Sequence, residues 1–270
     1  MLRLFPDRYV AALSTDELAV CRRSQVTGRL RGPIVSTPGL GVNSGEPWRS
    51  PLSALRAHLL GLNKSRFELE LVLSDQFFQF VLVPWSDEVT SAAERESLAR
   101  IQFETMFGNA AFEAPKISEA GYGEPAIACA INAGLLKEFN DLAEEMQFAI
   151  VSVIPRFMAV FNRWRRRFDK NCAFLVIDDF DCVLLCIKAG NPVSIRSFRF
   201  LSRESTDFKK LVERELLLED MNEGTPVYYY GSHEEDQNLF DAYKTVDLQL
   251  RRREQVGSAH AMLLLGNLDA

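Results

Sequence analysis

The chain has few of the residues that build metal centres. Its 270 residues include only three histidines, His58, His233 and His260, and these are widely spaced. The five cysteines are odd in number, and the closest two, Cys182 and Cys186, have neither a second cysteine pair nor clustered histidines to complete a ligand set. Structural zinc sites need such clusters at characteristic spacings. The sequence therefore predicts no zinc site, and buried, reduced cysteines.

Long apolar runs and an excess of positive charge are also missing. Nowhere do about 18 consecutive apolar residues occur, the length that a membrane-spanning helix needs, and the first seven residues lack the apolar stretch of a signal peptide. The 31 Lys and Arg residues are outnumbered by 37 Asp and Glu residues, which gives a net charge of −6. A general nucleic-acid-binding protein needs a basic surface. We therefore expect a cytoplasmic protein that binds no nucleic acid and meets membranes only through partners.

The apolar residues that are present follow strand and helix patterns. They make up 47% of the chain, enough for the core of one large domain or two of ordinary size. Alternating or continuous apolar runs predict strands, and apolar residues at helical spacing predict helices. The expected strands are 67–73, 125–131, 148–154, 173–177, 182–188, 193–201 and 226–230, and the expected helices are 51–62, 91–107, 133–146, 155–168, 206–218, 234–243 and 259–265.

The order of these elements indicates how they pair. The strand 125–131, the helix 133–146 and the strand 148–154 are joined by short connections, which predicts a βαβ unit and a partly parallel sheet. The stretch 28–51 is rich in Gly, Pro and Ser and predicts a long loop, or short strands joined by loops. An antiparallel meander followed by alternating helix and strand, as found from Cys172 onwards, is the order of a ribonuclease H-like unit.

Three apolar runs break at aspartates and then resume. The breaks are at Asp7, at Asp75 and at Asp178 to Asp181, and each predicts a β-hairpin with an acidic elbow. The first half of the chain is compatible with the same order of elements as the second half. We therefore predict an α/β protein of two ribonuclease H-like lobes, residues 1–154 and 155–270, with mixed sheets flanked by helices and an interlobe helix at 155–168.

The whole chain resembles the two-lobed actin-like proteins of type IV pilus and type II secretion inner-membrane platforms, the PilM and GspL groups. The resemblance spans most of the chain and rests on Met1 to Asp7, on Leu73 to Phe80 running into Val83-Pro84-Trp85, and on the hairpin that begins at Val176. It implies two actin-like ATPase lobes around a cleft that holds ATP in some members and is degenerate in others. It also implies binding to a cytoplasmic segment of an inner-membrane platform protein or to an assembly ATPase, and it is compatible with a homodimer.

The nucleotide site that the resemblance implies is incomplete in this sequence. An actin-like phosphate loop would need Asp-x-Gly, but large side chains follow both Asp7 and Asp179, and after the strand 226–230 Gly231 stands without a second glycine. A side chain in place of glycine blocks the close approach of backbone N–H groups to phosphate. The sequence therefore predicts no catalytic residue and no cofactor. The alternative is an actin-like ATPase or phosphotransferase that binds ATP and Mg²⁺ near Asp7, Asp179 and Gly231.

The aspartates of the third elbow have a second interpretation. Asp178, Asp179 and Asp181 are candidates for the metal-binding carboxylates of a ribonuclease H-type nuclease. Adjacent residues on a strand point to opposite faces, so Asp178 and Asp179 do not easily bind one ion. A hairpin turn explains all three more simply, because aspartate tolerates turn conformations.

Two groups of residues are candidates for binding a partner. The basic run at 163–167 ends the helix predicted at 155–168, where cations complement the helix dipole. It also suits an acidic partner or anionic lipid head groups. The aromatic group cannot all face one side of a sheet, so it either leaves surface for a partner or packs into two core layers. The basic residues are Arg163, Arg165, Arg166 and Arg167, and the aromatic residues are Phe77, Phe78, Phe80 and Trp85.

Overall fold

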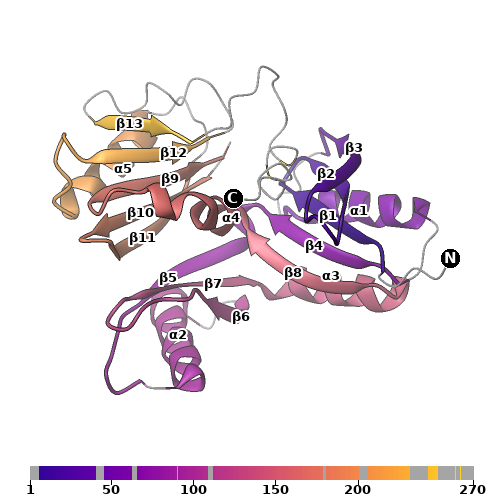
Figure 1. Ribbon diagram of the computed structural model, residues 1–270, viewed down its shortest axis with the longest axis horizontal. Helices are drawn as coiled ribbons and strands as arrows, with labels where there is room; N and C mark the ends of the chain where they lie inside the picture. Colours follow the sequence, from indigo (N-terminus) through magenta and orange to yellow (C-terminus); the bar gives the residue numbers. More distant parts are fainter. Residues whose placement is uncertain are drawn as a thin grey trace. The chain divides into compact units, whose positions relative to one another are not determined.

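The chain divides into two compact units, and neither of them is continuous in sequence. The computed structural model describes residues 6–40, 46–62, 66–89, 91–108, 112–178, 181–200, 206–231 and 243–248, together with Ala259 and Met262 (Figure 1). Unit 1 comprises Met1–Phe77, Gly134–Arg163 and Arg252–Ala270, and unit 2 comprises Phe78–Ala133 and Trp164–Arg251. The division into lobes at residue 154 stays a prediction.

Unit 1 is built on a five-stranded mixed sheet. Its strands lie in the order β3-β2-β1-β4-β8, where β1, β2 and β3 are antiparallel neighbours and β4 and β8 run parallel to β1. β1 and β4 are therefore surrounded by other strands and are almost entirely buried, as their apolar sequences require. The bounds are β1 Arg8–Leu13, β2 Leu18–Arg23, β3 Leu30–Thr37, β4 Glu68–Leu73 and β8 Ala149–Pro155.

Three helices accompany this sheet. They are α1 (Arg49–Gly61), α3 (Ala133–Met146) and α4 (Arg156–Trp164). α1 contacts β1 and β2 and buries Leu55 and Leu59 completely or nearly so. No helix within the described ranges is both long enough and apolar enough to span a bilayer.

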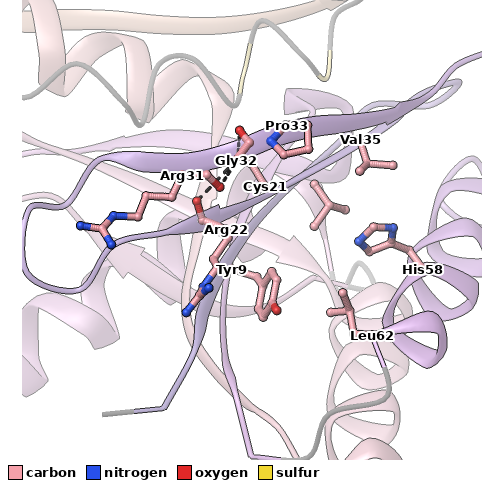
Figure 2. Close-up of a pocket in the computed structure, with 10 residues that line it drawn as sticks. Tyr9, Cys21, Arg22, Arg31, Gly32, Pro33, Val35, His58 and Leu62 are labelled. Carbon is pink, nitrogen blue, oxygen red and sulfur yellow. Dashed lines mark hydrogen bonds between the residues drawn. The ribbon is translucent and has the colours of Figure 1, made fainter. Parts of the chain in front are cut away.

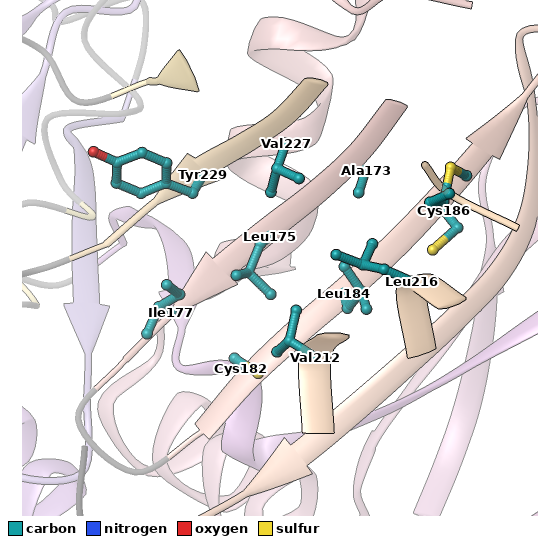
Figure 3. Close-up of a cluster of buried hydrophobic side chains, with 11 residues drawn as sticks. Ala173, Leu175, Ile177, Cys182, Leu184, Cys186, Val212, Leu216, Val227 and Tyr229 are labelled. Atoms are coloured by element: carbon teal, nitrogen blue, oxygen red, sulfur yellow. The ribbon is translucent and has the colours of Figure 1, made fainter. Parts of the chain in front are cut away.

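Unit 2 repeats the strand order of unit 1. Its sheet runs β11-β10-β9-β12-β13, with three antiparallel strands followed by two that are parallel to β9. Figure 3 shows one face of this sheet, where Leu184, Cys182 and Cys186 pack with Leu216 of helix α5 (Thr206–Leu218). The strands are β9 Cys172–Ile177, β10 Asp181–Lys188, β11 Asn191–Arg199, β12 Pro226–Tyr230 and β13 Lys244–Asp247.

Unit 2 also contains a smaller antiparallel sheet, in the order β5-β7-β6. Helix α2 packs against β5 and β6 and begins with a capping box, in which Ser91 and Glu94 satisfy each other's backbone N–H groups. Phe103 of α2 completes the core of this layer. The bounds are β5 Phe78–Val83, β6 Phe112–Ile117, β7 Ala126–Asn132 and α2 Ala92–Phe107, and short 3₁₀ segments occur at η1 Asp75–Phe77 and η2 Arg165–Arg167.

The fold class is confirmed, with two mixed sheets of the same ribonuclease H-like order and flanking helices. The hairpin at Asp178 to Asp181 is confirmed as the β9–β10 connection. The other two hairpin predictions are wrong. β1 begins just after Asp7 and turns at Ser14–Glu17 instead. β4 and β5 belong to different sheets, because β1 and β8 occupy both edges of β4.

The predicted βαβ unit is wrong for a similar reason. α3 connects β7 of the small sheet to β8 of the five-stranded sheet, so the two strands never share a sheet. The parallel pairing occurs instead between β4 and β8. The Gly- and Pro-rich stretch 28–51 contains the eight-residue β3, which agrees with the second of the two alternatives for it. The helix predicted at 234–243 falls almost entirely outside the described residues.

Candidate functional site

The turn that joins β1 to β2 lies where the first acidic elbow belongs in the fold. The N–H of Ser14 donates to the carbonyl of Glu17 at 2.9 Å. The Ser14 hydroxyl donates to the Asp16 carboxylate at 2.8 Å and accepts the N–H of Glu17 at 3.0 Å. Two backbone donors are thus used inside the turn, and it contains no glycine. This turn lacks the open glycine backbone that phosphate needs.

Asp7 lies before β1 in a network of charges. Its carboxylate pairs with Arg22 of β2. The neighbouring Arg8 contacts Glu68 at 2.6 Å and Glu70 at 3.3 Å, and the hydrogen bond to Glu68 raises the pKa of Arg8. Tyr9 is buried against Phe67, with ring centroids 5.6 Å apart. The side chains around Asp7 therefore serve strand packing and charge pairing.

The elbow of unit 2 is a closed hairpin. The N–H of Asp178 donates to the carbonyl of Asp181 at 2.8 Å, and both residues are 4% exposed. Asp179, which is a candidate for both nucleotide and metal binding, falls outside the described residues, and Gly231 is buried just after β12. No group of three or more His, Cys, Asp or Glu residues is placed to hold a metal within the described ranges. Asp178 and Asp181 thus lie where the turn interpretation predicts.

The phenylalanines predicted to face a partner are core residues. Phe77, Phe78 and Phe80 are 1%, 5% and 3% exposed. Phe77 packs edge-on against Trp48 at 6.4 Å between ring centroids, and the Phe78 and Phe80 rings lie 6.4 Å apart. Buried rings offer no surface in this conformation, so the expectation of partner binding by these three is corrected in favour of core packing.

Trp85 differs from the phenylalanines because it is only half buried. It follows β5 and meets Tyr122, which precedes β7, with ring centroids 4.7 Å apart and ring planes at 64°. Both rings donate to the same oxygen, Asp87 Oδ1, with Trp85 Nε1 at 3.2 Å and the Tyr122 hydroxyl at 3.1 Å. We call Trp85, Asp87 and Tyr122 the aromatic patch. Sequence reasoning missed Tyr122, although its place between two glycines is a signal of an exposed turn.

The basic run ends α4 and continues into η2. Arg163 is half buried, whereas Arg165, Arg166 and Arg167 are exposed. The guanidinium carbon of Arg167 lies 4.8 Å from the ring centroid of Trp164, a cation–π arrangement. Three consecutive exposed arginines thus remain candidates for contact with an acidic or anionic partner.

A cavity of about 320 Å³ opens in unit 1 between β1, β2, β3 and the end of α1 (Figure 2). Burial lowers the pKa of His58, which favours the neutral imidazole at pH 7. Burial also raises the pKa of Cys21, whose thiol contacts the carbonyls of Arg22 and Arg31 at 3.5 and 3.6 Å. The lining residues are Tyr9, Val20, Cys21, Arg22, Arg31, Gly32, Pro33, Val35, His58 and Leu62. A protonated thiol and a neutral imidazole in this setting suit an apolar side chain better than a charged reactant.

Comparison by sequence finds no match among protein-family models or curated proteins. No protein-family model matches the chain. No curated protein matches it either. Comparison of structures does find similar proteins.

Several solved structures share the fold. A Bacteroides thetaiotaomicron protein with an actin-like ATPase fold and unknown function matches with a TM-score of 0.66 and 11% identity, covering 96% of this chain and 95% of that one. The PilM–PilN type IV pilus biogenesis complex matches with a TM-score of 0.61 and 14% identity, covering 90% of this chain and 88% of that one. The cytoplasmic domain of EpsL, an inner-membrane component of the Vibrio cholerae type II secretion system, gives 0.56 and 10%, covering 96% and 94%. The chain therefore has an actin-like ATPase fold and is similar in structure to proteins of pilus and secretion machines.

Proposed function

We propose that this protein is a non-catalytic, actin-like scaffold of a bacterial type IV pilus or type II secretion assembly platform. It binds a peptide or helix of an inner-membrane platform protein, or an assembly ATPase, at the cytoplasmic face of the membrane. The observation that carries the proposal is the shared fold, which covers 90% of the chain in the match to the PilM–PilN complex and 96% in the match to the EpsL cytoplasmic domain.

The local chemistry of the β1–β2 turn supports the non-catalytic part of the proposal. Phosphate is held in such folds by backbone N–H groups, and these must be free and unshielded by side chains. In this chain Ser14, Asp16 and Glu17 bond to one another across the turn. Glu17 is in addition 4% exposed and accepts the N–H of Ala259 at 2.8 Å. A carboxylate buried at this position repels a phosphate group rather than attracting it.

Exposed residues on unit 2 support the partner-binding part. The aromatic patch and the three arginines Arg165, Arg166 and Arg167 have the residue types that contribute most at protein interfaces, namely Trp, Tyr and Arg. Trp85 and the three arginines are sequence-predicted partner residues that lie at least partly at the surface, and the structure adds Asp87 and Tyr122. The ATP-binding alternative has the same fold in its favour, since a protein with an actin-like ATPase fold matches over most of the chain.

Deletion of the gene in the encoding bacterium tests the proposal. We expect the loss of surface pili, seen by electron microscopy, or of secreted proteins in the medium, and recovery when the wild-type chain is supplied on a plasmid. Membrane fractionation of the complemented strain should place the protein with the inner membrane only while the platform proteins are present. Normal pili and normal secretion in the deletion strain would contradict the proposed function.

A further inference from the structure

The aromatic patch is held in a defined conformation by its own loop. Tyr122 lies at the tip of a turn in which the N–H of Gly121 donates to the Glu124 carboxylate at 2.8 Å, and the N–H of Glu124 donates to the Gly121 carbonyl at 3.2 Å. Gly123 has φ +81°, a left-handed conformation that favours glycine. The ring of Tyr122 is therefore presented to solvent by a preformed turn, which lowers the entropy lost on binding.

Exposure of this ring is unusual for an aromatic side chain held in place by packing. Tyr122 is 86% exposed, although its ring touches Trp85 and its hydroxyl is hydrogen bonded to a carboxylate from a different loop. The two rings meet at 64°, so one face of Tyr122 stays open beside the Asp87 carboxylate. An exposed aromatic face next to a carboxylate attracts cations through both the ring quadrupole and direct charge.

The charges within the two segments that form the patch have a single sign. The two segments that form it, 84–89 and 118–124, carry four acidic side chains and no Lys, Arg or His. All four acidic residues are exposed. They are Asp87, Glu88, Glu119 and Glu124. The local field therefore favours a positively charged ligand.

This field also argues against two other occupants. A second copy of the chain that docked patch to patch across a two-fold axis would place like charges opposite each other, which costs binding energy. An anionic membrane surface would be repelled for the same reason. A basic protein segment remains, and the cytoplasmic segments next to membrane spans are rich in Lys and Arg.

We propose that the aromatic patch binds an arginine or lysine side chain in a short basic segment of the membrane partner. The cation lies over the open face of Tyr122 and pairs with Asp87, while Trp85 supports the tyrosine ring from the other side. The patch is thus the contact through which the scaffold recognises the cytoplasmic, membrane-proximal part of its partner. The identity of the partner as a membrane protein rests on the proposed function, whereas the cationic chemistry rests on the patch alone.

Fluorescence anisotropy with the full chain tests this binding. The probe is a fluorescein-labelled peptide of alternating arginine and leucine, and its control replaces each arginine with citrulline, which keeps the shape and removes the charge. We expect the arginine peptide to bind and the citrulline peptide to bind at least about tenfold more weakly. This difference corresponds to the loss of one desolvated cation contact.

Variants of the patch identify the contact. Tyr122→Ala should lower the affinity for the arginine peptide by about five- to tenfold. Tyr122→Phe keeps the ring, so its affinity should stay within about twofold of the wild type. Asp87→Asn should weaken binding by about fivefold. The matched control is Glu138→Gln on α3, an exposed site in unit 1 that changes the net charge by the same amount and should leave affinity unchanged.

Three results would overturn the inference. They are equal binding of the arginine and citrulline peptides, equal effects of Tyr122→Ala and Glu138→Gln, and a change of oligomeric state in Tyr122→Ala by sedimentation, which would assign the patch to a second copy. If the peptide does not bind but the deletion strain still loses pili or secretion, the binding role of the patch is refuted and the proposed function stands. Conversely, peptide binding without a deletion phenotype would refute the function and keep the patch.

Discussion

Asp75, the aspartate between β4 and β5, is predicted to stabilise unit 1 rather than to take part in chemistry. It is 3% exposed, and its Oδ1 accepts the N–H of Phe157, the second residue of α4, at 2.8 Å. Its Oδ2 lies 3.7 Å from Nε of Arg156, and the two side chains are 1% and 2% exposed. One carboxylate therefore binds an N–H of the first turn of α4 and offsets a buried guanidinium.

The size of the effect follows from these two contacts. Asp75→Asn keeps an oxygen for the Phe157 N–H but removes the negative charge that lies beside the buried Arg156 guanidinium. Removing one partner of a buried ion pair lowers the free energy of unfolding by about 3–5 kcal/mol. Asp75→Ala also loses the bond to the helix terminus and should cost ~1 kcal/mol more. The double variant Asp75→Asn with Arg156→Met should be less damaging than the sum of its single variants, because the Asp75–Arg156 contact is lost only once.

Urea unfolding followed by circular dichroism measures these differences. The matched control is Arg56→Met, which breaks the ion pair to Glu145 on the surface of the same unit, where both side chains are 52% exposed. A pair of that kind contributes at most about 1 kcal/mol. Asp75 has no such stabilising role if Asp75→Asn lowers the free energy of unfolding no more than Arg56→Met does, or if the double variant is as unstable as the two single losses added together.

Three further predictions concern the rest of the fold. Burial raises the pKa of both Cys172 and Cys186 to about 12, from an ordinary 9.0. Because the unfolded chain releases these protons at lower pH than the folded chain, the urea midpoint should fall as pH rises from 9.0 towards 12. The fall should be less steep in the double variant Cys172→Ala/Cys186→Ala. Ser14→Ala, which removes the hydroxyl that accepts the Glu17 N–H, should lower the free energy of unfolding by about 1–3 kcal/mol in chemical denaturation. Leu184→Ala, at 1% exposure, should cost about 2–5 kcal/mol in the same assay, and a cost below 1 kcal/mol would show that the site is not a packed core.

Local patterns in the sequence predict most elements but not their partners. α5 begins and ends where helical spacing places it, at Thr206 and Leu218. The strand and turn signals around Asp75 are also correct in kind, because β4 ends and β5 begins beside it. The assignment of the two strands to different sheets depends on β1 and β8, which are distant in sequence, and no local pattern contains that information.

The candidate site shows the same limit. Trp85 is visible as an aromatic residue after a strand, but its contact with Tyr122 brings together two loops separated by an entire helix and strand. The exact place of the first turn is also ambiguous in sequence, because apolar runs flank both Asp7 and Asp16. The register of β1 with β2 places the turn. Arg8 pairs with Arg23 and Leu13 pairs with Leu18, so the turn between the two strands lies at 14–17.

We propose that the fold has given up nucleotide chemistry for partner binding. Titration of the full chain with ATP and Mg²⁺ in an isothermal calorimeter measures whether the protein binds nucleotide. The closed Ser14–Glu17 turn predicts no saturable binding in the micromolar range and no release of phosphate on prolonged incubation. Saturable micromolar binding of ATP, accompanied by its hydrolysis, would show that the protein is an ATPase and not a non-catalytic scaffold.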